Sequence, residues 1–114
     1  MPSFLARGGG TFFVSDAIPT TTVNVPTTGQ TYTMSAGQDE VYFNHSATIA
    51  ALTVKLPASS RPGDAVILKF RSIVTTLTVQ NAAAVTVTTA PVTATAGQKQ
   101  EYRYVDNTVG WIYW

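Results

Sequence analysis

A chain of 114 residues has the length of one domain, and its lack of cysteine excludes disulfides and thiolate metal sites. Charged residues make up only 11% of it and the net charge is +1, which leaves no basic surface for nucleic acid. No apolar run approaches the roughly 20 residues of a membrane-spanning helix. We therefore expect neither a nucleic-acid partner nor a membrane partner.

The first 28 residues have the composition of an extended arm. Residues 8–10 are three consecutive glycines, which favour a flexible hinge. Residues 19–28 are rich in Thr and Pro, and Val23 and Val25 alternate with polar residues, which favours extended backbone. We predict an N-terminal arm over residues 1–28 with room for one edge strand; a disordered tail is the alternative. The side chains that would anchor this arm are Phe4, Leu5, Phe12 and Phe13.

The densest apolar pattern runs from Leu52 to Val87, within a domain assigned to residues 29–114. Leu52, Val54 and Leu56 alternate with Thr and Lys, which is the period of a half-buried strand. Further strands are predicted at residues 65–71, 77–79 and 85–87, and Arg61-Pro62-Gly63-Asp64 is predicted to form a turn. We expect this region to form the core.

Short turns that contain glycine precede four predicted strands. They are Gly29-Gln30, Gly37-Gln38, Gly63-Asp64 and Gly97-Gln98. Two of them share the pattern T-x-[ST]-A-G-Q-x-x-x-Y, from Thr33 to Tyr42 and from Thr93 to Tyr102. We predict two similar hairpins, each with an inward tyrosine. Two uses of one turn explain the match better than an internal duplication, because the flanking residues differ. Copies at the fixed period of a solenoid are not visible.

The sequence contains no convincing helix. Residues 47–51 and 82–84 are the only candidates, but the first leads straight into the strand at Leu52 and the second is too short. We predict an all-β fold of roughly eight to ten short strands. A jelly-roll-like β-sandwich with an extended N-terminal arm is the first choice. A small barrel or a trimeric intertwined β-structure is the second.

The single histidine, His45, lies beside a predicted turn. With no second His and no Cys in the chain, a metal site is not expected. No Ser has the surroundings of a strained nucleophile elbow, so a Ser-His-Asp set is not expected either. We predict a surface His45 without a chemical role.

The six carboxylates form no catalytic pattern. Asp39 and Glu40 are adjacent, so in a strand they would point to opposite faces. Asp64 and Asp106 fit turns, and Glu101 fits a surface ion pair with Arg103. We therefore predict no catalytic residue, no metal and no cofactor, and a protein that is not an enzyme.

Aromatic residues gather at the C-terminal end. They are Tyr102, Tyr104, Trp111, Tyr113 and Trp114. Alternation puts Trp111 and Tyr113 on one face of the last strand and Ile112 and Trp114 on the other, so both faces are apolar. Exposed rings could stack on sugars or bases, but no basic stripe accompanies them. We predict that Trp111, Tyr113 and Trp114 lie in the core or in a subunit interface.

The pattern of residues 49–114 resembles small β-rich virion proteins of tailed bacteriophages. The resemblance lies in Leu52–Pro57, Pro62–Phe70 and Leu77–Val79, and then in Ala96-Gly97-Gln98, Glu101–Tyr104 and Gly110-Trp111. Such segments recur in capsid decoration (cement) proteins and in tail-fibre domains, usually as homotrimers. The resemblance implies no site residue, because it lies in the general pattern of the strands and turns and includes no fixed site motif.

The resemblance implies a decoration protein on the capsid surface of a virion. Its partners would be further copies of itself, as a homotrimer, and the major capsid protein, which Phe4, Leu5, Phe12 and Phe13 of the arm would contact. Binding only the assembled shell would stabilise it by mass action. Two alternatives stay open: a tail-fibre or receptor-binding module that grips host glycans, and a carbohydrate-binding β-sandwich.

Overall fold

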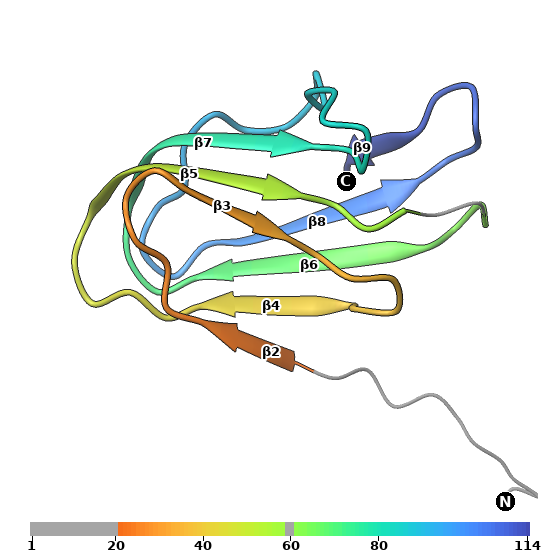
Figure 1. Cartoon of the computed structure of the whole chain (residues 1–114). Helices are drawn as coiled ribbons and strands as arrows, with labels where there is room; N and C mark the ends of the chain where they lie inside the picture. The colour runs from red at the N-terminus through yellow and green to blue at the C-terminus, as the bar shows by residue number, and fades with distance from the viewer. Residues whose placement is uncertain (1–20, 59–60) are drawn as a thin grey trace, which may run out of the picture.

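The computed structural model describes residues 21–58 and 61–114, and in this part of the chain it contains eight strands and no helix (Figure 1). The strands are β2 (Thr21–Asn24), β3 (Gln30–Thr33), β4 (Glu40–Phe43), β5 (Ile49–Lys55), β6 (Ala65–Phe70), β7 (Val74–Gln80), β8 (Lys99–Tyr104) and β9 (Trp111–Tyr113). The predicted anchors Phe4, Leu5, Phe12 and Phe13 lie outside the described residues. Within the described ranges, no helix is present that could cross a membrane.

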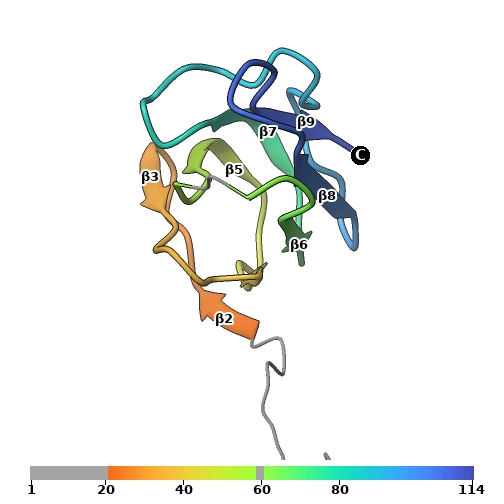
Figure 2. The same cartoon turned by 90° about the vertical axis from the view of Figure 1, so that its right-hand side faces the viewer.

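The strands form two sheets, and the chain moves from one sheet to the other at every step from β2 to β7. The five-stranded sheet has the order β2-β4-β6-β8-β9, and the three-stranded sheet has the order β3-β5-β7. The strands β2, β4 and β6 are mutually parallel, as are β3, β5 and β7. Figure 1 shows the two sets of arrows pointing in opposite directions, and Figure 2 looks along the strands. The chain therefore winds through three turns: β2–β3, β4–β5 and β6–β7.

The prediction of an all-β fold with two sheets is confirmed, but the pairing differs from that of a jelly roll. A jelly roll pairs its strands antiparallel in Greek-key order, whereas six of the described strands pair in parallel. The winding has no fixed sequence period because its turns differ in length. Thr21 pairs with Glu40, and Glu40 pairs with Ile67 much further along the chain. A search for a constant repeat therefore misses it.

Side chains on the inner faces stack in columns from one turn of the winding to the next. Val41 lies in register with Leu68, and Phe43 with Phe70, whose rings stack with centroids 5.2 Å apart. In the three-stranded sheet, Leu52–Leu77 and Val54–Val79 form the matching pairs. All eight are buried. In the first turn of the winding, which is β2 and β3, the residues in register with these columns are instead Thr22, Asn24, Gln30 and Tyr32.

The winding is covered at one end and open at the other. After β7 the chain runs back along the outer edge of this strand, with antiparallel bridges from Gln80 to Thr86 and from Val74 to Ala94. Strand β8 then pairs antiparallel with β6, and β9 pairs with β8. At the other end, the outer edges of β2 and β3 have no neighbouring strand among the described residues. We call these two edges the open end.

The Gly-Gln turns are three uses of one hydrogen-bonded turn. The backbone N–H of each Gln donates to the carbonyl of the residue three positions earlier. The N–H of that earlier residue donates in return to the Gln side-chain Oε1. The pairs are Thr27/Gln30, Ser35/Gln38 and Thr95/Gln98. The glycines Gly29, Gly37 and Gly97 have φ of 82°, 88° and 78°, a region that other residues rarely adopt. The prediction of repeated use of one turn is confirmed.

The hairpin part of that prediction is wrong. The turn at Gln38 joins β3 to β4, which belong to different sheets, so it is a corner between sheets. Tyr102 is buried as predicted, but Tyr42 alternates with the buried Val41 and Phe43 and therefore lies on the outer face. The two tyrosines lie at the same sequence distance from their turns, yet they lie on opposite sides of the five-stranded sheet.

Candidate interaction surfaces

His45 is buried, so its prediction as a surface residue is wrong. Only 3% of it is exposed, and its Nε2–H donates to the carbonyl of Ser72 at 2.9 Å. Because a carbonyl can only accept a hydrogen bond, Nε2 carries the proton of the neutral ring. Nδ1 is buried and has no hydrogen-bond partner in the described chain. The ring ties the β4–β5 connection to the β6–β7 connection.

Most of the described carboxylates are occupied by ion pairs or turns. Lys69 lies 3.1 Å from Glu40, and Arg103 Nε lies 2.8 Å from Glu101, which confirms the predicted surface pair. Asp106 accepts two backbone N–H groups in its turn and Asp64 pairs with Arg61, so both are turn residues as predicted. Over the described ranges, no three His, Cys, Asp or Glu residues are grouped to hold a metal ion.

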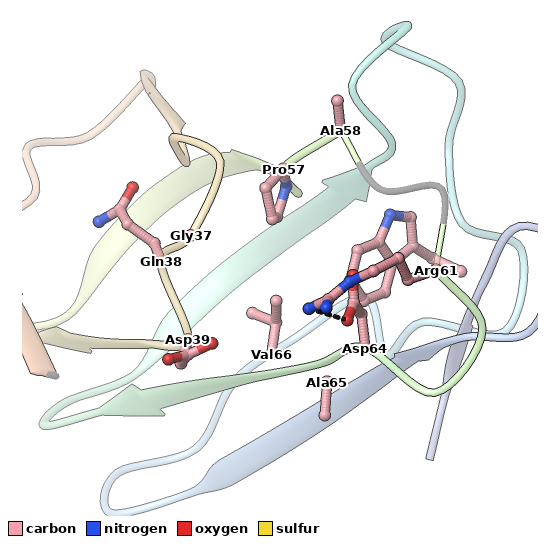
Figure 3. Close-up of a pocket in the computed structure, with 10 residues that line it drawn as sticks. Gly37, Gln38, Asp39, Pro57, Ala58, Arg61, Asp64, Ala65 and Val66 are labelled. Carbon is pink, nitrogen blue, oxygen red and sulfur yellow. Dashed lines mark hydrogen bonds and ion pairs between the residues drawn. The ribbon is translucent and has the colours of Figure 1, made fainter. Parts of the chain in front are cut away.

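A small pocket lies where the β3–β4 corner meets the β5–β6 connection (Figure 3). Asp39 lines one side, the Arg61–Asp64 pair the other, and Pro57 and Trp111 complete the wall. Its volume is about 100 Å³, whereas pockets for small molecules span roughly 300–1,000 Å³. It has room for a few water molecules and gives no reason to assign a substrate.

On the inner face of the C-terminal hairpin, Trp111 belongs to the core, whereas Tyr113 at the end of the strand is 38% exposed. The Trp111 ring is buried against Tyr104 with centroids 5.6 Å apart, and Tyr113 packs against Tyr102 at 5.6 Å. The Tyr102 hydroxyl donates to Gln100 Oε1 at 2.6 Å, and burial, followed by the nearby Tyr113, raises the pKa of Tyr102 above its usual range. Tyr102 is therefore a neutral hydrogen-bond donor in the core. Of the three predicted C-terminal site residues, Trp111 is a core residue.

The outer face of this hairpin carries the most exposed ring among the described residues. Trp114 is 65% exposed, and the Arg103 guanidinium lies 4.5 Å from its ring centroid, a cation–π distance. Its backbone N–H donates to the carbonyl of Glu101, which extends the hairpin by one residue. Ile112 alternates onto this same face, beside Arg103. We call Arg103, Ile112 and Trp114 the C-terminal patch. Trp114 lies on the opposite face from Tyr113, as alternation predicted.

The β2 edge of the open end lies at the far edge of the same five-stranded sheet. The outer edge of β2 is unpaired in the described chain, and Val23 beside it is 60% exposed. Residues 21–38, which make up the whole first turn of the winding, contain no charged side chain. Natural edge strands are usually protected by Lys, Pro or covering segments, and β2 and β3 contain neither Lys nor Pro. The sequence shows this uncharged run, but the predicted arm of residues 1–28 includes only its first part, and residues 29–38 fall in the predicted domain.

Comparisons of the chain with protein-family models, curated proteins and solved structures find no match in any of the three.

Proposed function

We propose that the protein is a non-enzymatic structural protein of a virion, a capsid decoration protein that binds the assembled shell. The observation that carries this proposal is the outer edge of β2, which has no neighbouring strand among the described residues and contains no Lys or Pro. An uncharged strand edge offers backbone hydrogen bonds to another chain, and folded proteins avoid leaving such an edge free. In a protein that acts within an assembly, a neighbouring chain can pair with this edge.

The C-terminal patch supports the same role. Trp and Arg are the residue types most enriched at binding hot spots, and here the Trp114 ring is held in place by the guanidinium of Arg103. The patch and the β2 edge lie at opposite edges of one sheet. A contact between one edge and the opposite edge of the next copy is head-to-tail, and such contacts form a ring when the rotation between copies closes and an open filament when it does not. A homotrimer is the ring that the bacteriophage resemblance implies.

The segments that carry the resemblance lie in the second and third turns of the winding and in the C-terminal hairpin. They include most of β5, the turn before β6, β6 itself, the second half of β7, most of β8 and the start of β9, and their inward residues belong mainly to the core. On this proposal the bacteriophage-like pattern belongs to the scaffold. Contact with the major capsid protein, on the capsid surface, is then the task of the N-terminal residues, among them Phe4 and Leu5.

The test is binding to assembled shells. Purified full-length chain, mixed with empty tailed-phage capsids that lack it, should sediment with the capsids and not with unassembled capsid subunits. A chain that lacks residues 1–10 should remain folded by circular dichroism and lose capsid binding. Undiminished decoration by this shortened chain would contradict the role of the N-terminal residues. Gold-labelled antibody found only at the tail of intact particles would contradict the shell location.

The exposed Trp114 favours one alternative, a tail-fibre module that binds host glycans. Trp111 is buried, so a sugar that stacks on the patch should change the fluorescence of Trp114 alone. A decoration protein should show no saturable change when host polysaccharide is added. A saturable change that disappears in Trp114→Phe would favour the glycan-binding alternative.

A further inference from the structure

The outer face of the five-stranded sheet places two lysines directly opposite each other. Lys69 of β6 and Lys99 of β8 are register partners, and alternation turns both side chains away from the core. Side chains that lie directly opposite on an antiparallel pair have their Cβ atoms about 5 Å apart, and like charges at such positions destabilise a sheet. Natural proteins break local rules of this kind mainly where function requires it.

A third cation lies beside this pair. Arg71 follows β6, and its Nη1 donates to Asn44 Oδ1, a neutral partner, at 3.1 Å. Lys69 Nζ lies 3.1 Å from a Glu40 carboxylate oxygen, whereas Arg71 and Lys99 form no ion pair within the described residues. All three cations are exposed. We call Lys69, Arg71 and Lys99 the cationic patch.

The cationic patch lies at an end of the sandwich whose described connections contain no acidic side chain. Strands β2, β4 and β6 end here and β8 begins here, on the left in Figure 1. The connections that meet at this end are residues 25–29, 44–48, 71–73 and 95–98, and their sequences contain no Asp or Glu. The described aspartates lie in connections at the other end; they are Asp39, Asp64 and Asp106. Glu101, two residues after Lys99, is already paired with Arg103.

The surroundings of the patch fit a protein surface better than a nucleic acid. Nucleic-acid binding needs a stripe of cations along the phosphate backbone. Glu40 and Glu101 lie on the same outer face as the patch and would repel phosphates. A protein surface carries charges of both signs, so it can supply carboxylates to the lysines without this repulsion. The anion that fits the patch is therefore a carboxylate of another protein.

The patch is continuous with a row of side chains that ends at the β2 edge. Val23, Tyr42 and Lys69 are register partners in β2, β4 and β6, and Lys99 completes the row. Alternation places all four side chains on the outer face of the sheet. A ring of copies joined through the edges of their sheets leaves this face free for a further partner.

We propose that the cationic patch binds carboxylate side chains of the assembled shell. This inference rests on the proposed function, and it adds a second shell contact to that of the N-terminal residues. The shell would supply the acidic partners that Arg71 and Lys99 lack within the described chain. Because salt screens exposed ion pairs, this contact should weaken as salt rises, whereas the trimer contact should not.

Poly-L-glutamate tests the patch without a capsid. The full-length chain, added to the fluorescein-labelled polymer at about 0.05 M NaCl, should give a saturable rise in anisotropy, and the affinity should fall about tenfold or more at about 0.3 M NaCl. No binding at the lower salt concentration would overturn the proposal. Tighter binding to a DNA duplex than to the polymer would overturn the assignment of a protein partner.

Two substitutions of equal charge change locate the contact. Lys99→Gln should weaken polymer binding about fivefold or more and should not lower the thermal unfolding midpoint, because it removes the repulsion from Lys69. Lys55→Gln is the matched control and should change the affinity less than about twofold, since Lys55 ends β5 in the other sheet. Equal effects of the two substitutions would contradict a contact at the patch.

Sedimentation with empty tailed-phage capsids separates failure of the patch from failure of the proposed function. Lys99→Gln should weaken capsid binding about fivefold or more, and Lys55→Gln should leave it unchanged. Undiminished capsid binding by Lys99→Gln would overturn the patch and leave the proposed function intact. If the unmodified chain binds the polymer and no capsid, the proposed function is contradicted, and the shell is overturned as the source of the carboxylates.

Discussion

Gln38 shows how one residue type gains a second role from its position. Gln30, Gln38 and Gln98 all close the same turn through Oε1. Only Gln38 lies at a corner where its Nε2 reaches both sheets, and there it donates to Thr22 and Tyr32. The sequence pattern predicts the turn, but the second role depends on which strands meet at the corner.

Replacing Gln38 should therefore destabilise the fold more than replacing Gln98. Gln38→Ala removes the turn bond and both cross-sheet bonds, each worth about 1 kcal/mol, whereas Gln98→Ala removes the turn bond and a weak hydroxyl contact. Gln38→Glu keeps the acceptor for the turn and loses the two donors, so its effect should lie between the two. Urea denaturation of the three variants measures the free energies of unfolding. Equal losses for Gln38→Ala and Gln98→Ala would contradict a cross-sheet role.

At the scale of elements, alternation predicted most strands well and their partners poorly. The strand predicted at residues 85–87 is wrong, because only an isolated bridge from Thr86 to Gln80 forms there. The strand predicted from Leu52, Val54 and Leu56 is β5, the run at 65–71 is β6, and both show the expected inward residues. Period-two alternation is the same in parallel and antiparallel pairs, so it contains no information on the neighbouring strand. The winding of the chain between two sheets therefore had to come from the structure.

The candidate site was predictable only in part, for a related reason. Alternation correctly separated Tyr113 from Trp114, but it does not say which face of a strand another element covers. The face of Trp111 packs on Tyr104, and the face of Trp114 is exposed. The predicted arm left room for one edge strand, and β2 is such a strand, but the sequence could not show that it belongs to the sheet, because an edge strand and an extended arm have the same Thr- and Val-rich sequence.

Proline substitutions in β2 should separate folding from assembly. The Asn24 carbonyl accepts from the Asn44 N–H, so the backbone groups of Asn24 face β4. Because these groups alternate along a strand, the Thr22 N–H also faces β4, and the Val23 N–H faces the open edge. Val23→Pro should keep the fold and weaken self-association, because it removes a donor only from the outer edge. Thr22→Pro should lower the free energy of unfolding by about 2 kcal/mol, because it removes a hydrogen bond to β4 and the hydroxyl that accepts from Gln38.

Thermal unfolding and light scattering at micromolar concentration report the two effects. An unchanged oligomer in Val23→Pro would show that the β2 edge is not the contact. Equal destabilisation by the two prolines would contradict the assigned direction of the Val23 N–H.

At the scale of the whole molecule, the two candidate contacts differ in charge. The first turn of the winding, at the β2 edge, has no charged residue, whereas the patch at the opposite edge contains Arg103, which is paired with Glu101. An interface that joins the two edges cannot form ion pairs, because the first turn of the winding has no charged side chain. Its stability must come from apolar burial and backbone hydrogen bonds, which salt screens little.

A trimer built in this way should depend strongly on Trp114 and weakly on salt. Trp114→Ala should raise the dissociation constant by about 30-fold, as expected for a hot-spot residue worth about 2 kcal/mol. Val109→Ala is the control, because Val109 is also exposed but lies in the β8–β9 turn, outside the patch. Between about 0.1 and about 1 M NaCl, where the screening length falls from about 10 to about 3 Å, the dissociation constant of the unmodified chain should change less than about threefold.

Sedimentation of the chain and its variants over a range of concentrations measures these constants. A trimer that dissociates as salt rises would place the contact on the charged outer face, where Lys69 pairs with Glu40 and Arg103 with Glu101. A trimer that Trp114→Ala leaves unchanged would remove the patch from the interface and leave its ring free for another ligand. A monomer at all concentrations would contradict the head-to-tail trimer.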